Sequence, residues 1–283
     1  MNHIKLYRTR KGIFAEYQQQ WYHISVEWDE LVNRQPLFSA LRALLADVLS
    51  QPDIASIVRG DLLPPIGSQE VWAAGVTYQR SKVARMEESE MSGAAACYDK
   101  VYMAERPELF FKATPQRTVG HGDEIYIRRD SDWNVPEPEL TLFVNREGNI
   151  SGYTIGNDMS SRSIEGENPL YLPQAKTYER CAAIGPCLLV TELPIPSDTL
   201  IQMKIYRNGA MLFHDHISIS QMKRTHTELV EYLYRGCRFL HGCYLMTGTC
   251  LVPGNGFTLQ ENDLVEIAID HIGVLLNTVK AGV

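Results

Sequence analysis

The stretch Asn134–Phe143, NVPEPELTLF, contains the start of the strand around which the rest of the chain can be arranged. Its second half is apolar and predicts a strand that enters the protein interior. Its first half places Glu137 and Glu139 where that strand begins, next to prolines that fix φ and remove two backbone donors. Such prolines favour an edge strand or the rim of a cavity. The stretch therefore predicts a strand with two acidic side chains at its mouth.

Glu137 and Glu139 point to the same face of this strand, about 7 Å apart along the chain. Two carboxylates this close in a partly buried place raise each other's pKa unless a cation lies between them. Mg²⁺ binds in this way, through carboxylates, waters and substrate oxygens. Asp158, where the strand in GYTIGNDMSSR (152–162) becomes polar, is the candidate third ligand. The alternative from spacing alone is two solvated acids on an edge strand and an aspartate in a turn.

Two later segments add candidate site residues. Residues 161–186 read as about 25 residues of loop, and long irregular segments in compact domains are usually functional. Lys176 in this segment is either an ordinary surface lysine or, near a metal, a group that holds substrate charge or acts as a base. The glycine-rich turn MTGTCLVPGNG (246–256) can bind a carboxylate through backbone donors and the hydroxyl of Thr247 or Thr249.

The remaining pattern predicts an α+β, mainly β protein in two parts. Residues 3–27 alternate polar and apolar side chains, which predicts short strands, and apolar positions after Pro36 follow helical spacing. The stretch LLPPIGSQE (62–70) reads as a linker, so we expect a small N-terminal α/β domain over 1–66 and a catalytic domain over 67–283. Further strands are expected at 70–78, 106–114, 123–129, 140–158, 187–192, 200–220, 243–249, 257–260 and 264–270. Within 200–220, Asn208-Gly209 predicts a hairpin turn. A helix is expected after the capping box at 225–228, and a helix or flap at 78–91.

Composition excludes several classes of protein. The 283 residues are 45% hydrophobic and 22% charged, as in ordinary globular proteins, and the net charge of -7 disfavours a nucleic-acid partner. No apolar run is long enough for a signal peptide or a membrane span, so we expect no membrane association. The six cysteines form no CxxC, which favours reduced thiols and a cytoplasmic location over a zinc site or a disulfide framework.

Seven motifs in one order resemble the fumarylacetoacetate hydrolase superfamily over roughly residues 70–280. They are AAGVTY, RPELFFKAT, VGHGDEI, PEPELTLFV, GYTIGNDMSSR, LYLPQAK and TGTCLVPG. The resemblance implies a mixed β-roll catalytic domain behind a smaller N-terminal domain, in a homodimer or a dimer of dimers. It implies Mg²⁺, or alternatively Mn²⁺ or Ca²⁺, held by Glu137, Glu139 and Asp158. It also implies a small 2-oxo acid as substrate, contacted by Arg162 and Lys176.

One departure from the family pattern bears on the reaction. Family members that hydrolyse carbon–carbon bonds have a histidine and a glutamate after the first catalytic strand, in the pattern N-Y-x-x-H-x-x-E. Here the run is Thr77–Ala84, TYQRSKVA, with Ser81 in place of the histidine and Ala84 in place of the glutamate. The motifs are most similar to the 2-keto-3-deoxy sugar acid dehydratases of the superfamily. We therefore expect dehydration, for example of a 2-keto-3-deoxy-pentonate to 2-oxoglutarate semialdehyde.

Dehydration of such an acid removes a proton from C3 and expels the hydroxyl from C4. A metal that chelates the carboxylate and the ketone favours this step through a stabilised enolate, without an activated water. A base and an acid are still needed, and Lys176 and Glu108 are our candidates for the two roles. The alternative for Glu108 is a salt bridge to Arg106 or Lys112. The residues expected to bind substrate are Arg80, Arg162, Tyr78, Phe111 and Thr249.

Two other functions stay open at this point. One is a hydrolase or decarboxylase of acylpyruvate-like 2-oxo acids that uses an unidentified residue. The other is a non-catalytic protein that binds a 2-oxo acid. A further pair, His214 and His216, lies on one face of an expected strand, but no third ligand is evident, so surface histidines are the favoured interpretation.

Overall fold

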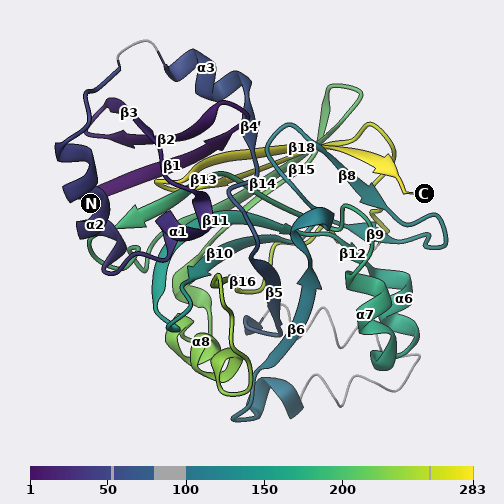
Figure 1. Ribbon diagram of the computed structural model, residues 1–283. Helices are drawn as coiled ribbons and strands as arrows, with labels where there is room; N and C mark the ends of the chain where they lie inside the picture. The colour runs from purple at the N-terminus through teal and green to yellow at the C-terminus, as the bar shows by residue number, and fades with distance from the viewer. Residues whose placement is uncertain (52–53, 80–99, 255, 283) are drawn as a thin grey trace.

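A computed structural model describes residues 1–51, 54–79, 100–254 and 256–282 (Figure 1). Its strands are β1 (His3–Thr9), β2 (Gly12–Tyr17), β3 (Gln20–Ile24), β4 (Leu62–Leu63), β5 (Glu70–Gly75), β6 (Glu108–Ala113), β7 (Thr118–Val119), β8 (Glu124–Ile127), β9 (Asn134–Val135), β10 (Pro138–Val144), β11 (Ile150–Asp158), β12 (Ser160–Ser161), β13 (Ala182–Thr191), β14 (Leu200–Arg207), β15 (Ala210–Ser218), β16 (Cys243–Met246), β17 (Leu264–Ile269) and β18 (Gly273–Ala281). Its α-helices are α1 (Trp28–Val32), α2 (Leu37–Ala46), α3 (Ala55–Gly60), α6 (Arg162–Glu167), α7 (Leu172–Lys176) and α8 (His226–Tyr234), and 3₁₀ turns lie at Pro115–Arg117, Pro169–Tyr171 and Ile219–Gln221.

The strands form two main sheets. In the described part of the chain, the larger sheet has the order β3-β2-β1-β13-β11-β10-β16-β5-β6, with β4 paired to β1 and β7 paired to β13. The smaller sheet has the order β15-β14-β17-β18-β8, and β9 pairs with β12 apart from both. Most pairs are antiparallel, but β16 with β5, β13 with β7 and β18 with β8 are parallel. The expected α+β, mainly β class with mixed sheets is confirmed.

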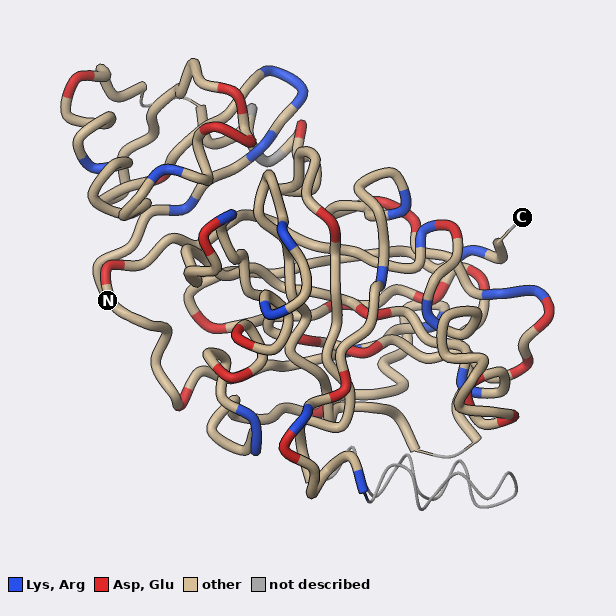
Figure 2. Tube along the Cα trace, turned by 60° about the horizontal axis from the view of Figure 1, so that its bottom comes forward, with Lys and Arg blue, Asp and Glu red and all other residues tan. Residues whose placement is uncertain are grey.

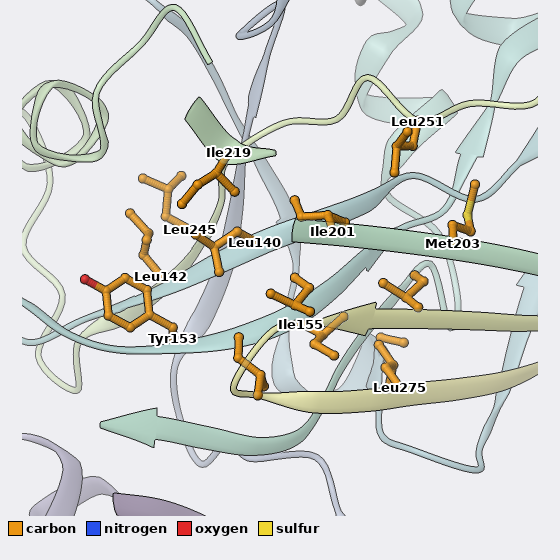
Figure 3. Packing of buried hydrophobic residues seen from close by; sticks show 14 of the residues in the cluster. Leu140, Leu142, Tyr153, Ile155, Ile201, Met203, Ile219, Leu245, Leu251 and Leu275 are labelled. Carbon is orange, nitrogen blue, oxygen red and sulfur yellow. The ribbon is translucent and has the colours of Figure 1, made fainter. Parts of the chain in front are cut away.

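Strand β10 lies in the middle of the larger sheet and divides its side chains between two cores. Leu140 and Leu142 point into the core between the two sheets (Figure 3). Their neighbours from the smaller sheet include Ile201, Met203 and Leu275. Phe143 points to the opposite face and packs against Tyr244, with ring centroids 5.3 Å apart. Because side chains alternate along a strand, Glu139 lies on the Phe143 face, outside the core between the sheets.

The N-terminal segment joins the larger sheet directly. Strand β1 pairs with β13 from His3 opposite Thr191 to Leu6 opposite Leu188. Helices α1 and α2 cover the face of this sheet that bears Phe143, and they contribute Leu31 and Leu41 to the second core. The pairing makes one continuous sheet from both segments, and the division into domains at residue 66 stays a prediction.

Several local predictions are confirmed and two are wrong. Asn208 and Gly209 turn β14 into β15, and the Thr225 hydroxyl caps α8 by accepting a hydrogen bond from the backbone of Glu228. Residues 257–260, however, form no strand. The segment 161–186 is not a simple loop, because it folds into α6, a 3₁₀ turn, α7 and the start of β13. Short polar helices without an apolar stripe give too weak a periodic signal to be read from sequence.

Charged positions are distributed over the described part of the chain (Figure 2). Basic and acidic positions are interspersed along the trace, without a continuous basic stripe among the described residues (Figure 2). None of the described helices is long and apolar enough to cross a membrane. The cysteines at 181, 187, 237, 243 and 250 are free thiols.

Candidate metal and catalytic site

Three carboxylates meet where β10 begins and β11 ends. Glu137, Glu139 and Asp158 are each at most 3% exposed, and one oxygen from each lies within 4.8 Å of the others. The backbone N–H of Asp158 donates to the carbonyl of Glu137 at 2.9 Å, which fixes the two strand ends relative to each other. Opposite Glu139 lies Gly156, where a Cβ would be 2.2 Å from the Thr141 hydroxyl. The close approach of β10 and β11 at the site therefore requires glycine.

The donor set fits a hard divalent cation. Mg²⁺ holds oxygens at about 2.1 Å and Ca²⁺ at about 2.5 Å, so two oxygens bound to one ion lie at most about 4.2 to 5 Å apart. The spacing within 4.8 Å is compatible with Ca²⁺ directly and with Mg²⁺ after shifts of about half an ångström. Glu137, Glu139 and Asp158, the ligands expected from the sequence, are the group that can hold such an ion among the described residues.

Lys176 carries its ammonium into this cluster. The residue ends helix α7 and is completely buried. Its Nζ donates to Glu137 Oε2 at 2.6 Å, to Asp158 Oδ2 at 3.1 Å and to Ser160 Oγ at 2.5 Å. The ring of Phe110 lies 5.7 Å below it. The surface-lysine alternative is therefore wrong, because all three ammonium donors are used inside the protein.

Lys112 is a second buried ammonium, on β6. Its Nζ forms an ion pair with Asp158 Oδ1 at 2.6 Å and donates to the backbone carbonyls of Met159 and Lys176. The sequence suggested Lys112 only as a salt-bridge partner of Glu108, and that pairing is replaced by the one with Asp158. Sequence reasoning missed this buried charge, and the signal that could have found it is a lysine inside the otherwise apolar run LFFKA.

Arg162 forms an ion pair with one of the three carboxylates. It begins α6, is 3% exposed, and donates from Nη2 to Glu137 Oε1 at 2.8 Å. Its Nε lies 4.0 Å from Glu165 Oε2. The described contacts of Arg162 thus orient Glu137, and its expected contact with substrate stays a prediction.

The protein environment shifts the pKa values of Glu139 and Asp158 in opposite directions. Burial raises the pKa of Glu139 well above its ordinary value, and the charges of Asp158 and Glu137 raise it further. Burial acts in the same direction on Asp158, but the ammonium groups of Lys112 and Lys176 outweigh it and lower the pKa of Asp158. In the absence of a metal, Glu139 is the carboxylate of this pair that most lacks a compensating positive charge.

The turn after β16 contacts the cluster at Glu139. The backbone N–H of Gly248 donates to Glu139 Oε2 at 2.5 Å, and the next residue, Thr249, is 7% exposed. The phenol of Tyr78 is buried; burial raises its pKa well above the ordinary value, and the charges of Cys250 and Glu139 add to this. The structure thus brings Tyr78 and Thr249, both expected at the substrate site, to the surroundings of Glu139.

Gly248 offers a direct test of this turn. Its φ is +93°, and an added Cβ would lie 2.1 Å from Thr77 Oγ1 and 2.9 Å from the carbonyl oxygen of Ala74. We expect Gly248→Ala to lower the free energy of unfolding by about 3 kcal/mol, from backbone strain and overpacking together. The control is Gly209→Ala, with φ +79° and open space, which should cost about 1 kcal/mol. Equal losses in urea unfolding of the two variants would contradict the steric part of this prediction.

Glu108 lies on the same face of β6 as Phe110, two residues away. Its carboxylate covers Gly75, where a Cβ would meet Oε2 at 2.0 Å. Glu108 Oε2 is buried and accepts no hydrogen bond from the described residues. Phe111 contacts Trp72 edge-on at 5.9 Å, while Phe110 lies beside Lys176, and the expected contact of Phe111 with substrate stays a prediction. Arg80, Ser81 and Ala84 lie outside the described residues.

Comparisons with known proteins identify the family. The fumarylacetoacetate (FAA) hydrolase C-terminal family matches residues 71–280, which is well over half of the chain. The chain belongs to the fumarylacetoacetate hydrolase family. The family resemblance deduced from the seven sequence motifs is therefore confirmed.

Two similar proteins and one similar solved structure are named as dehydratases. A probable 2-keto-3-deoxyxylonate dehydratase of Haloferax volcanii is 53% identical over 216 residues, 76% of this chain and 73% of the relative. A 2-dehydro-3-deoxy-D-arabinonate dehydratase of Saccharolobus solfataricus is 38% identical over 98% of this chain and 96% of the relative. A solved 2-keto-3-deoxy-D-arabinonate dehydratase complexed with magnesium and 2,5-dioxopentanoate has a TM-score of 0.82, 33% identity and 99% coverage of both chains.

Proposed function

We propose that this member of the fumarylacetoacetate hydrolase family is a hydro-lyase that dehydrates a 2-keto-3-deoxy sugar acid with Mg²⁺, or alternatively Mn²⁺ or Ca²⁺. The observation that carries the proposal is the buried ammonium of Lys176 on two of the three clustered carboxylates. It puts a proton-carrying group beside a site that can hold a cation. The names of the dehydratase relatives and the magnesium complex of one of them support the same reaction.

The chemistry can be written with balanced atoms for a 2-keto-3-deoxy-pentonate. Loss of a C3 proton and of the C4 hydroxyl, which leaves as water, forms a C3–C4 double bond conjugated with the ketone. Transfer of a C5 proton to C3 then gives an enol that becomes the C5 aldehyde of 2,5-dioxopentanoate, also called 2-oxoglutarate semialdehyde. When bound, a divalent cation would polarise the 2-oxo acid and lower the pKa of the C3 proton.

The contacts of Lys176 and Glu108 indicate which of the two residues acts as the acid and which as the base. Lys176 carries an ammonium beside the candidate metal ligands Glu137 and Asp158, so it has a proton to give to the departing C4 hydroxyl. Glu108 has a buried oxygen with no donor among the described residues, so it retains the accepting capacity that a base needs. We assign Glu108 as the base and Lys176 as the acid. In this proposal Arg80, Tyr78, Arg162, Phe111 and Thr249 orient the substrate.

The family resemblance extends the proposal to the assembly and the location of the enzyme. We propose that the enzyme is a homodimer or a dimer of dimers in the cytoplasm, and that its bound partner is a small 2-oxo acid. The absence of the histidine and glutamate pair from TYQRSKVA favours dehydration over hydrolysis, because a carbon–carbon hydrolase has to activate water.

The test is to incubate the purified protein with Mg²⁺ and a panel of 2-keto-3-deoxy pentonates and hexonates. We expect one or more of them to yield an aldehyde that a carbonyl reagent traps, and EDTA should abolish the yield. Release of pyruvate from an acylpyruvate, without dehydration of any sugar acid, would instead establish the hydrolase alternative. Tight binding of a 2-oxo acid without any product would establish the non-catalytic alternative.

A further inference from the structure

Lys112 occupies an irregular position in β6 that directs its side chain to the site. Val71 of β5 pairs with Ala113, while Trp72 pairs with Phe111, so Lys112 is an extra residue without a partner in β5. Such a bulge changes the direction of a side chain, and bulges are common beside active sites. A lysine on a regular strand would follow the simple alternation of its neighbours. The bulge is therefore the local reason why an ammonium on an edge strand reaches Asp158.

The Lys112 ammonium connects two segments of the chain, the end of β11 and the end of α7. It binds Asp158 at the end of β11, the carbonyl of Met159 that follows it, and the carbonyl of Lys176 at the end of α7. The last carbonyls of a helix have no partner within the helix, so the Lys176 carbonyl needs an outside donor. Two ammonium protons go to backbone carbonyls, the charge pairs with Asp158, and Lys112 is completely buried over the ring of Tyr178.

Lys112 and Lys176 contact different oxygens of the Asp158 carboxylate. Lys112 holds Oδ1 of Asp158, and Lys176 holds Oδ2. Rotation of the Asp158 carboxylate would break one of these contacts. Lys112 also anchors the backbone from which the Lys176 side chain extends, so it acts on both the candidate ligand and the candidate acid without reaching the substrate itself.

We propose that Lys112 is a positioning residue for the dehydration proposed above, which fixes the Asp158 carboxylate and the backbone of Lys176 in their working geometry. This inference rests on the proposed function for its kinetic consequences. It also has a consequence that does not depend on turnover, because a misoriented Asp158 binds a divalent cation less well. Mutation of a residue that holds a metal ligand in place typically changes metal affinity or activity about 10- to 100-fold.

The test uses Lys112→Met, which keeps most of the side-chain volume and removes the ammonium. We expect Mn²⁺ affinity, measured by electron paramagnetic resonance of the free ion, to fall about 10- to 100-fold. At saturating metal we expect kcat to fall by about the same factor while KM changes by less than about threefold. Leu41→Ala, in α2, is the control for general destabilisation, and below its unfolding temperature it should keep wild-type Mn²⁺ affinity and kcat.

A folded Lys112→Met protein with wild-type Mn²⁺ affinity and wild-type kcat would overturn the inference. If Lys112→Met does not fold, Lys112→Arg decides, because it keeps the charge but a planar guanidinium does not match three acceptors around one nitrogen. Reduced kcat or metal affinity in folded Lys112→Arg supports positioning, and wild-type values for both overturn it. Failure of the proposed function is recognised separately, because the wild-type protein itself would then dehydrate none of the sugar acids.

Discussion

Glu139→Gln is expected to abolish divalent-metal binding and to raise the stability of the metal-free protein. The folded state raises the pKa of Glu139 above its ordinary value of 4.5, so the metal-free protein loses stability as the pH rises above that value. Glutamine removes this loss at neutral pH and still accepts the Gly248 hydrogen bond. Without the carboxylate, however, the cation loses one of three charged ligands, and we expect kcat to fall by at least about 10³-fold.

Thermal unfolding with EDTA and with excess Mg²⁺ separates the two effects. Wild-type protein should gain about 2.7 kcal/mol at a Mg²⁺ concentration of 100 times Kd, and Glu139→Gln should gain nothing. The control is Glu266→Gln, whose carboxylate pairs with Lys204 on the smaller sheet at 2.9 Å and should leave the Mg²⁺ effect intact. Mg²⁺ stabilisation that persists in Glu139→Gln, Glu137→Gln and Asp158→Asn would place the metal elsewhere.

Glu108→Gln and Lys176→Met are expected to lower kcat by about 10²- to 10⁴-fold each, because each removes one of the proton-transfer groups. Glu108 makes no described contact with the three carboxylates, so Glu108→Gln should keep the wild-type Mg²⁺ affinity. Lys176→Met should change metal affinity, since its ammonium binds Glu137 and Asp158 directly. Initial rates of aldehyde formation and Mg²⁺ titration by calorimetry measure these outcomes.

A matched pair of controls lies on the surface of the smaller sheet. Lys280 pairs with Glu124 at 3.0 Å, and both side chains are well exposed. Lys280→Met and Glu124→Gln make the same chemical changes as the two site variants and should leave kcat within about twofold, because exposed ion pairs contribute little. Near-normal turnover in both Glu108→Gln and Lys176→Met, with metal bound, would refute the proposed acid and base.

Sequence patterns predicted the parts of this protein that depend on local chemistry. The alternation in LTLF, the turn at Asn208-Gly209 and the cap at Thr225 specify strand, hairpin and helix start through interactions among near neighbours. The two glutamates of PEPEL and the aspartate of GND were also recognisable from sequence, because acidic residues at the ends of apolar strands are unusual unless they serve a site.

The partners of these carboxylates could not be read in the same way. Three contacts depend on strand pairing and on a bulge. Lys112 binds Asp158, and Gly248 binds Glu139. Phe110, rather than Phe111, lies under Lys176. A bulge of one residue reverses which side chains face the site, and no local propensity records it.

Sequence by itself determined the mainly β class, the family and the three candidate metal ligands. Tertiary structure decided how their charges are balanced, because buried ammonium groups from β6 and α7 reach the carboxylates only when residues 18 (Lys176 and Asp158) to 46 (Lys112 and Asp158) positions apart fold together. Burial then gives those contacts their strength, since charges removed from water must be compensated by the protein itself.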